Sequence, residues 1–207
     1  FIVRYADQRF FPMDEGLYAI AQDIDFDELQ NSALEVATPV VIFHRSADKE
    51  WIYVASELSD GWVKADKVVI SEWLDFEAYL TSSSLVVVTS PKADLYLDEA
   101  RTRFYDHVRM GAKLPAATTN RPDVYEVLLP TLASGGAMKL KTVYIKKELA
   151  SAGYLPYTPR VVLEQAFKML NEPYGWGGMY GEQDCSSFLQ GVFATVGITL
   201  PRDSKDQ

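Results

Sequence analysis

Asp184-Cys185-Ser186-Ser187-Phe188 begins an apolar helical pattern, and this stretch decides how the fold of the 207-residue chain is interpreted. Asp is a strong N-cap, because its carboxylate accepts hydrogen bonds from the free N–H groups of the first helical turn. We therefore expect a helix from Cys185 to about Val196, ended by Gly197. Its apolar face follows helical spacing and consists of Phe188, Leu189, Val192, Phe193 and Val196.

Cys185 is the first residue of this predicted helix, where the positive end of the helix dipole favours a thiolate. The N–H groups nearby can also stabilise an oxyanion. It is the chain's only cysteine, and a lone cysteine is more often an inert core residue than a nucleophile. The polar helix entrance and the Gly-rich loop upstream favour the nucleophile. Because the carboxylate of Asp184 disfavours a neighbouring thiolate, activation needs a cationic partner such as His.

Short β-type runs separated by turns fill the middle of the chain. They predict two consecutive small β-barrels at residues 39–74 and 81–149, with residues 1–38 packing as an N-terminal segment on the first. Residues 25–34 favour a short helix, residues 68–70 a short strand and residues 72–80 a connecting helix. After residue 150 the pattern becomes helical: Thr158 suits an N-cap and Pro159 a first helical residue.

Three motifs in the last 58 residues together resemble the front half of an NlpC/P60-type cell-wall cysteine peptidase. They are Pro173-Tyr174-Gly175-Trp176-Gly177-Gly178, then Asp184-Cys185-Ser186-Ser187-Phe188, then Gly197-Ile198-Thr199-Leu200-Pro201-Arg202-Asp203-Ser204. Upstream, the first of two bacterial SH3-like domains that precede such peptidases is resembled by Phe26-Asp27-Glu28-Leu29-Gln30-Asn31-Ser32, then His44-Arg45-Ser46-Ala47-Asp48, Trp51 and Gly61-Trp62-Val63. Met110-Gly111-Ala112-Lys113-Leu114-Pro115 resembles part of the second.

The resemblance implies a multidomain chain: two small all-β SH3-like barrels followed by an α+β papain-like domain. Residues 150–207 would be the N-terminal part of that domain, which we expect to be truncated in this chain. The family's general base is a His well downstream of the Cys, followed by a third polar residue. We therefore expect both beyond Gln207, because the chain has only His44 and His107.

The resemblance also implies roles for seven residues. Cys185 is the nucleophile, and the hydroxyl of Tyr174 helps to stabilise the oxyanion. Asp184 binds the free amino group of the substrate's L-Ala. The remaining residues lie along the substrate cleft, where Arg202 suits a substrate carboxylate; they are Ser186, Arg202, Asp203 and Ser204. No metal and no cofactor is implied.

The implied reaction is hydrolysis of the amide between γ-D-Glu and an L-diamino acid in peptidoglycan stem peptides, through a thioester on Cys185. A free N-terminal L-Ala is the preferred substrate end. The expected enzyme is thus a cysteine-type endopeptidase. The alternative is a non-catalytic cell-wall-binding SH3-like protein whose thiol is inert.

Charge and hydropathy limit the partners. The chain has 20 Lys and Arg residues and 29 Asp and Glu residues, a net charge of −9, and this diffuse acidity argues against nucleic acid. No apolar run approaches the roughly 18 residues of a membrane span. We expect a monomer in the cell envelope, in a periplasm, with the cytoplasm as the alternative. A chain that begins at Phe1 is expected to be processed or partial.

Four further residues are weaker candidates. His44 and His107 fall in β-type runs and read as surface or half-buried strand histidines. Asp48 and Trp51 of the first barrel are possible additions to the cleft, because loops of small barrels often carry binding residues. The glycines of the loop at 175–178 are not followed by the Lys-Ser/Thr of a phosphate-binding loop.

Overall fold

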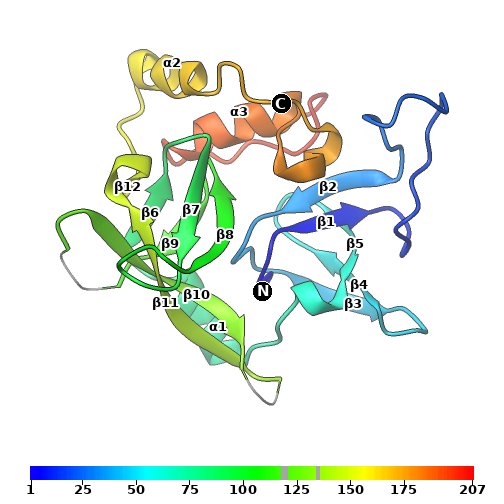
Figure 1. The fold of residues 1–207 in the computed structure, drawn as a ribbon, viewed down its shortest axis with the longest axis horizontal. Coiled ribbons are helices and arrows are strands. Elements are labelled where there is room, and N and C mark those ends of the chain that lie inside the picture. Colours follow the sequence, from blue (N-terminus) through cyan, green and yellow to red (C-terminus); the bar gives the residue numbers. More distant parts are fainter. Residues whose placement is uncertain (118–120, 134–135) are drawn as a thin grey trace.

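The structure is a computed structural model that describes residues 1–117, 121–133 and 136–207. It contains three sheets, and two longer helices lie beside them near the end of the chain (Figure 1). The strands are β1 (Ala6–Arg9), β2 (Gln30–Leu34), β3 (Val41–Arg45), β4 (Trp51–Ala55), β5 (Asp60–Lys64), β6 (Leu85–Val88), β7 (Lys92–Tyr96), β8 (Phe104–Arg109), β9 (Lys113–Pro115), β10 (Val124–Leu132), β11 (Met138–Lys146) and β12 (Ala150–Ala152). The helices are α1 (Trp73–Leu80), α2 (Pro159–Lys168) and α3 (Cys185–Ala194), and the 3-10 segments are η1 (Ala65–Lys67), η2 (Lys147–Leu149) and η3 (Trp176–Gly181).

The first sheet is antiparallel and has the strand order β2-β1-β5-β4-β3. Alternate residues of β2 and β5 are buried, as expected for strands with one buried face, whereas every residue of β3 is exposed. The core of this part of the chain is small and aliphatic and contains Ile2, Ala6, Leu34, Ile52, Val54, Val63 and Val68.

The predicted helix over residues 25–34 is wrong, because residues 30–34 form β2. Asp27 prevents a helix here: its Oδ1 accepts hydrogen bonds from the N–H groups of Leu17 and Leu29, and its Oδ2 lies 2.9 Å from Nη1 of Arg9. These contacts fix a turn that leads into the strand. The expected strand at 68–70 is also wrong, since only one isolated bridge joins Ile2 and Val68.

Two further sheets share the second core. One has the order β10-β11-β7-β8 and the other β12-β6-β9. The predicted β-type runs of this region are confirmed as strands, and so is the connecting helix, which is α1. The core residues are aliphatic and include Val86, Val88, Leu95, Val108, Leu114, Val127, Leu129, Val143 and Ile145.

Two sheets run across the boundaries drawn from the sequence. The N-terminal segment contributes β1 and β2 to the first sheet, beside β5 of the predicted first barrel. Likewise β12, which begins at residue 150, pairs with β6. The division into residues 1–38, 39–74, 81–149 and 150–207 stays a prediction.

The two predicted helices near the end of the chain are confirmed. Thr158 caps α2 and accepts a hydrogen bond from the N–H of Val161, and Pro159 is the first helical residue. Asp184 caps α3. Within residues 1–117, 121–133 and 136–207, no helix combines the length and apolarity that crossing a membrane requires.

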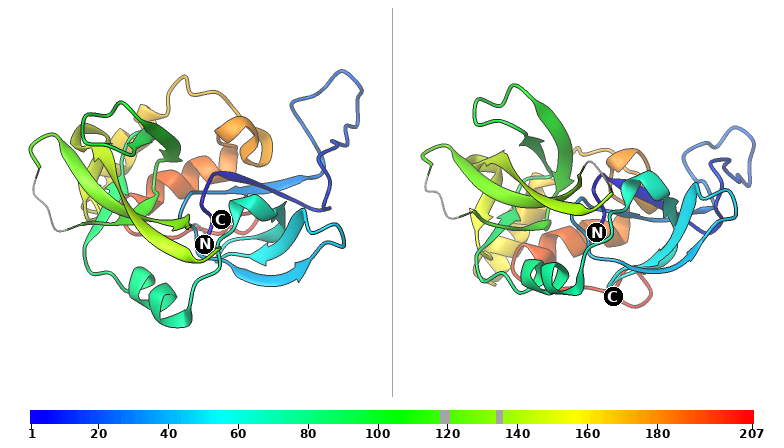
Figure 2. Two further views of the ribbon diagram at one scale, coloured as in Figure 1. Left: turned by 60° about the horizontal axis from the view of Figure 1, so that its bottom comes forward. Right: turned by 90° about the horizontal axis from the view of Figure 1, so that it is seen from below.

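The second β-rich part lies against α3 through a close backbone contact. At Gly111, in the turn between β8 and β9, φ is +85°, and an added Cβ would lie 2.6 Å from the Cβ of Ala194. Only glycine allows this approach. On the other side, the long connection between β1 and β2 extends away from the sheet in both views of Figure 2.

We predict that Gly111→Ala lowers the free energy of unfolding by about 2–4 kcal/mol, because positive φ and overpacking both act at this site. The matched control is Gly153→Ala: φ there is +75°, but nothing lies within 4 Å of an added Cβ. The control should cost only about 1 kcal/mol of backbone strain. Urea unfolding of both variants measures the difference, and equal costs would contradict the contact with α3.

Candidate active site at the start of helix α3

Asp184 and Ser187 form a reciprocal cap at the start of α3. Oδ1 of Asp184 accepts a hydrogen bond from the N–H of Ser187 at 2.9 Å, and Oγ of Ser187 accepts one from the N–H of Asp184 at 2.8 Å. Cys185 is the first helical residue, and its thiol is free and exposed. A thiol in this position lies at the positive end of a ten-residue helix, beside the free N–H groups of its first turn.

Arg202 clamps the carboxylate of Asp184. Its Nη2 donates to Oδ2 at 2.6 Å and its Nη1 to Oδ1 at 3.3 Å, while Nη1 also donates to Oγ of Ser186 at 2.7 Å. The third nitrogen, Nε, donates to Oγ of Ser32 on β2 at 2.8 Å. The side chains of Arg202 and Asp184 are 13% and 9% exposed. The guanidinium therefore joins the first sheet to the start of α3.

The Asp184 carboxyl is ionised at neutral pH. Burial by itself raises its pKa, but the hydrogen bonds from Arg202 and Ser187 outweigh burial and hold the pKa below its usual value. The positive charge of Arg202 neutralises the carboxylate that precedes Cys185.

Tyr174 lies near this group. A parallel β-bridge joins it to Gln183, and the N–H of Gly175 donates to the carbonyl of Gln183 at 3.1 Å. Burial raises the pKa of the Tyr174 phenol, and the charges of Asp184 and Cys185 raise it further. The phenol is therefore protonated at neutral pH and can donate a hydrogen bond.

The glycine loop that carries Tyr174 is docked on β2. Gly177 and Gly178 have φ of +56° and +83°, and a Cβ at Gly178 would lie 2.6 Å from the Cβ of Ala33. Nε2 of Gln30 donates to the carbonyl of Gly177 at 3.1 Å, and the Tyr5 hydroxyl donates to the carbonyl of Gly178 at 2.5 Å. The first sheet therefore supports the loop through backbone contacts that only glycine permits.

Aromatic residues extend the site toward the β1–β2 connection. The ring of Phe26 lies 6.2 Å from that of Tyr174 and 5.5 Å from that of Trp176, measured between centroids. Because Phe26 is 44% exposed and Tyr174 is 53% exposed, the cluster presents an open aromatic surface beside the thiol helix.

The structure brings together some predicted site residues and leaves others apart. Asp184, Cys185, Ser186 and Arg202 form one group with Tyr174 beside it. Asp203 and Ser204 lie on the exposed turn after Arg202, with the Asp203 carboxylate 3.6 Å from Nζ of Lys205.

Sequence reasoning missed two groups of contacts. One comprises Ser32 and Gln30 of β2, which belong to the stretch that resembles an SH3-like domain but whose contacts with Arg202 and Gly177 were not predicted. The other is Gln207, whose Nε2 donates to the carbonyl of Ser186 at 3.1 Å.

The weaker candidate residues from the sequence make their contacts outside this site. The ring of His44 lies 5.9 Å from Trp62, and Nδ1 of His107 lies 2.8 Å from Oδ1 of Asp94. Trp51 is 3% exposed. Among the residues that the structure describes, no three His, Cys, Asp or Glu side chains are grouped so that they could hold a metal ion.

Two family models match parts of the chain. Residues 17–64 match an SH3 domain of the SH3b1 type, and residues 171–207 match the NlpC/P60 family. A gamma-D-glutamyl-L-lysine dipeptidyl-peptidase from Bacillus cereus is 30% identical over 149 residues, which are 71% of this chain and 42% of that protein. The bifunctional muramidase/DL-endopeptidase CwlT of Bacillus subtilis is 46% identical over 48 residues, 22% of this chain and 15% of that protein. The chain thus spans less than half the length of either relative.

Two solved structures are similar over the whole chain. An NlpC/P60 endopeptidase from Photobacterium damselae subsp. piscicida superposes with a TM-score of 0.81 at 28% identity, covering 100% of this chain and 44% of that one. An NlpC/P60 family protein from Bacillus cereus gives a TM-score of 0.76 at 20% identity, with 100% and 75% covered. The second likeness shows the fold alone.

We predict that Arg202→Gln lowers the free energy of unfolding at pH 7 by about 2–4 kcal/mol, because it leaves a buried carboxylate without its charge partner. Since the folded-state pKa of Asp184 is lowered, the pair's contribution is present above the unfolded pKa and is lost as pH falls through the folded pKa. The cost of the substitution should therefore shrink below about pH 4.

The matched control for this prediction is Arg160→Gln on α2. Arg160 and Glu164 are 3.9 Å apart and are 86% and 58% exposed, so its cost should stay within about 0.5 kcal/mol. Urea unfolding at pH 7 and pH 3.5 gives both numbers. A cost for Arg202→Gln that does not change with pH would contradict the assignment.

Proposed function

The chain is a relative of NlpC/P60 peptidases that carries an SH3b domain, and we propose that it contains the nucleophile of a peptidoglycan stem-peptide hydrolase. The observation that carries this proposal is the exposed thiol of Cys185 at the start of α3, with the Asp184–Arg202 pair and Tyr174 beside it. An inert structural cysteine is normally buried.

The proposed reaction is cleavage of the amide between γ-D-Glu and an L-diamino acid by a cysteine mechanism. Sγ of Cys185 attacks the carbonyl carbon, and the oxyanion that forms is stabilised by the N–H groups of the first turn of α3 and by the Tyr174 hydroxyl. The C–N bond then breaks, the amine leaves with a proton from the general acid, and a thioester remains. Water hydrolyses the thioester and returns the thiol.

The mechanism needs a proton acceptor for the thiol. His44 and His107 have Trp62 and Asp94 as their neighbours, so we propose that the base is a different His of the natural protein, supplied from beyond residue 207, together with a third polar residue that orients it.

We propose that Asp184 also recognises the free amino group of L-Ala at the substrate's end. The carboxylate is ionised, and Arg202 takes up part of its hydrogen-bonding capacity. The nearby exposed turn with Asp203 and Ser204, and the hydroxyl of Ser186, would border the same cleft. The relative from Bacillus cereus is named as a dipeptidyl-peptidase for gamma-D-glutamyl-L-lysine, which fits a cleft that accepts a short, free-ended peptide.

The two β-rich parts are proposed to be two SH3-like domains of this hydrolase. The first supports the glycine loop and Arg202 through β2, so its role includes holding the site in place. We propose that the protein acts on peptidoglycan peptides in the cell envelope, in a periplasm, and that it acts there as a monomer.

We predict that the natural protein containing residues 1–207 releases L-Ala-γ-D-Glu from L-Ala-γ-D-Glu-diaminopimelate, and that Cys185→Ala lowers kcat by about 1000-fold or more. Reversed-phase chromatography of the products measures both. The control is Arg160→Gln, which changes an exposed residue on α2 and should leave kcat unchanged. Full activity in the Cys185→Ala variant would refute the nucleophile and favour the wall-binding alternative.

We further predict that the protein turns over the free tripeptide about 10- to 100-fold faster than its N-acetylated form, measured as a ratio of kcat/KM, because acetylation removes the ammonium that faces Asp184. Asp184→Asn should reduce this ratio toward one. The ratio is insensitive to how much of the variant is folded, so it separates recognition from helix capping. Equal turnover of both peptides by the unsubstituted protein would leave Asp184 with a capping role alone.

A further inference from the structure

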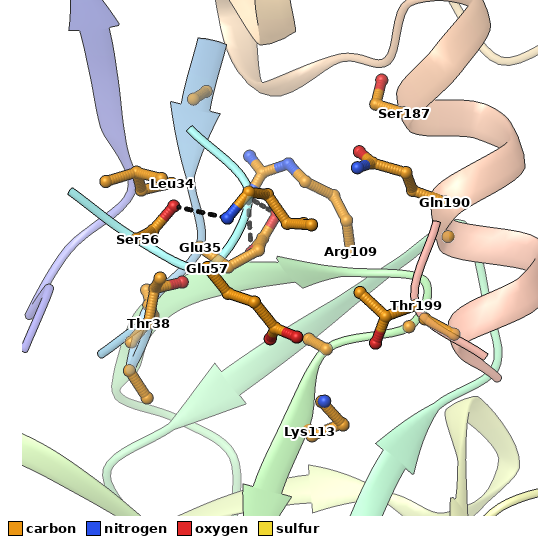
Figure 3. Close-up of a pocket in the computed structure, with 18 of the residues that line it drawn as sticks. Leu34, Glu35, Thr38, Ser56, Glu57, Arg109, Lys113, Ser187, Gln190 and Thr199 are labelled. Atoms are coloured by element: carbon orange, nitrogen blue, oxygen red, sulfur yellow. Dashed lines mark hydrogen bonds and ion pairs between the residues drawn. The ribbon is translucent and has the colours of Figure 1, made fainter. Parts of the chain in front are cut away.

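A cavity of about 440 Å³ lies between the first sheet, the second β-rich part and α3 (Figure 3). Its walls come from β2 and the segment after it, from the turn between β4 and β5, from the turn between β8 and β9, and from one face of α3. Helix α3 contributes Ser187 and Gln190 to this wall, whereas Cys185 and Tyr174 are not among the lining residues. The cavity therefore excludes the thiol but adjoins the candidate active site, because Ser32 and Arg202 belong to both.

The walls are held by contacts between separate parts of the chain. Nε of Arg109 donates to the carbonyl of Gly181 at 2.8 Å, and its Nη1 donates to both carboxylate oxygens of Glu35 at 3.2 Å. Gly111 and Ala194 are in close backbone contact on another side. These contacts tie the first sheet, the second β-rich part and the helical part together, so the cavity is preformed.

The volume and the lining residues of the cavity resemble those of small-molecule binding sites. Such sites measure about 300–1,000 Å³, lie between domains and combine apolar walls with a few polar groups. The apolar lining here includes Leu34, Val36, Leu58, Tyr79, Met110 and Leu200.

The charged residues of the cavity wall indicate which kind of ligand it can bind. Six charged side chains line the cavity, and four of them are already paired: Glu35 with Arg109, Glu182 with Lys92, and Arg202 with Asp184. The two others are Glu57 and Lys113. Both are exposed, and neither forms an ion pair with any residue in the described ranges 1–117, 121–133 and 136–207.

Glu57 and Lys113 come from different parts of the fold but line the same cavity. Glu57 lies in the turn before β5 and Lys113 is the first residue of β9. In Figure 3 both project into the cavity on the side away from the Glu35–Arg109 pair. One uncompensated carboxylate and one uncompensated ammonium, with an apolar wall between, match a ligand that carries the two opposite charges and an apolar side chain.

We propose that this cavity is a second ligand site, which binds a short zwitterionic peptide. Glu57 binds the peptide's ammonium group, Lys113 binds its carboxylate, and an apolar side chain of the peptide packs on the wall. The site operates independently of the proposed hydrolysis, since none of these contacts uses Cys185.

The test is binding of L-alanyl-L-leucine to the 207-residue chain, measured by calorimetry and by NMR shift changes up to about 10 mM, a range that covers weak affinities. The N-acetyl dipeptide and the dipeptide amide each lack one charge. Saturable binding is expected, with each modified peptide binding about threefold to tenfold more weakly.

Two variants identify the contacts. Glu57→Gln should weaken the dipeptide and the amide but leave the N-acetyl form unchanged, and Lys113→Gln should weaken the dipeptide and the N-acetyl form but leave the amide unchanged. Their controls, Glu77→Gln on α1 and Lys139→Gln on β11, change exposed residues outside the cavity and should bind all three peptides as the unsubstituted chain does.

Alkylation of Cys185 with iodoacetamide blocks the thiol, and the Glu57 and Lys113 variants, which leave Asp184 intact, separate this site from the ammonium site proposed at Asp184. Binding should survive alkylation. Loss of binding after alkylation, absence of saturable binding, or equal binding by all four variants would each overturn the proposal.

Discussion

The contact between Arg202 and Ser32 is the constraint on which the candidate site depends. These residues are 170 positions apart, and the 2.8 Å hydrogen bond between them fixes one nitrogen of the guanidinium on the first sheet. The other two nitrogens then point at Asp184 and Ser186 at the start of α3. Because a guanidinium is planar, holding one nitrogen orients the whole group. The position of the carboxylate next to Cys185 is thus set by β2 as well as by its own helix.

The position of the glycine loop also depends on the first sheet, through close contacts of the loop backbone. Gly177 and Gly178 approach Gln30 and Ala33 so closely that a side chain on either would displace β2. Hydrogen bonds from Gln30 and Tyr5 to the loop carbonyls hold it there. Tyr174 stands at the start of this loop, so its distance from the thiol helix is fixed by the same strand. The first sheet is therefore part of the framework of the site.

Features that depend on neighbouring residues were predicted well from the sequence, and contacts between residues far apart in the chain were predicted poorly. Capping residues fixed the beginnings of α2 and α3, because Thr158 and Asp184 act on N–H groups within three residues of themselves. Residues 25–34 were expected to be helical from their apolar spacing, and the ion pair of Asp27 with Arg9 and the pairing of β2 with β1 decide otherwise. Ser32 and Gln30 belong to a stretch that resembles an SH3-like domain, but nothing local links them to Arg202 and Gly177, and only the folded chain brings these residues together. The ion pair of Arg202 was missed for the same reason. From the sequence, Arg202 suited a substrate carboxylate, whereas in the structure it binds the carboxylate of Asp184.

That internal pairing changes the electrostatics of the thiol. Asp184 alone would place a full negative charge one residue from Cys185, against a helix dipole equivalent to about half a positive charge. With Arg202 bound to both oxygens of Asp184, the nearest full charges cancel, and the dipole and the N–H groups of the first turn act on the sulfur with little opposition. The arrangement therefore suits a nucleophile whose activation comes from a cationic partner, and it explains how a carboxylate can precede such a cysteine without suppressing it.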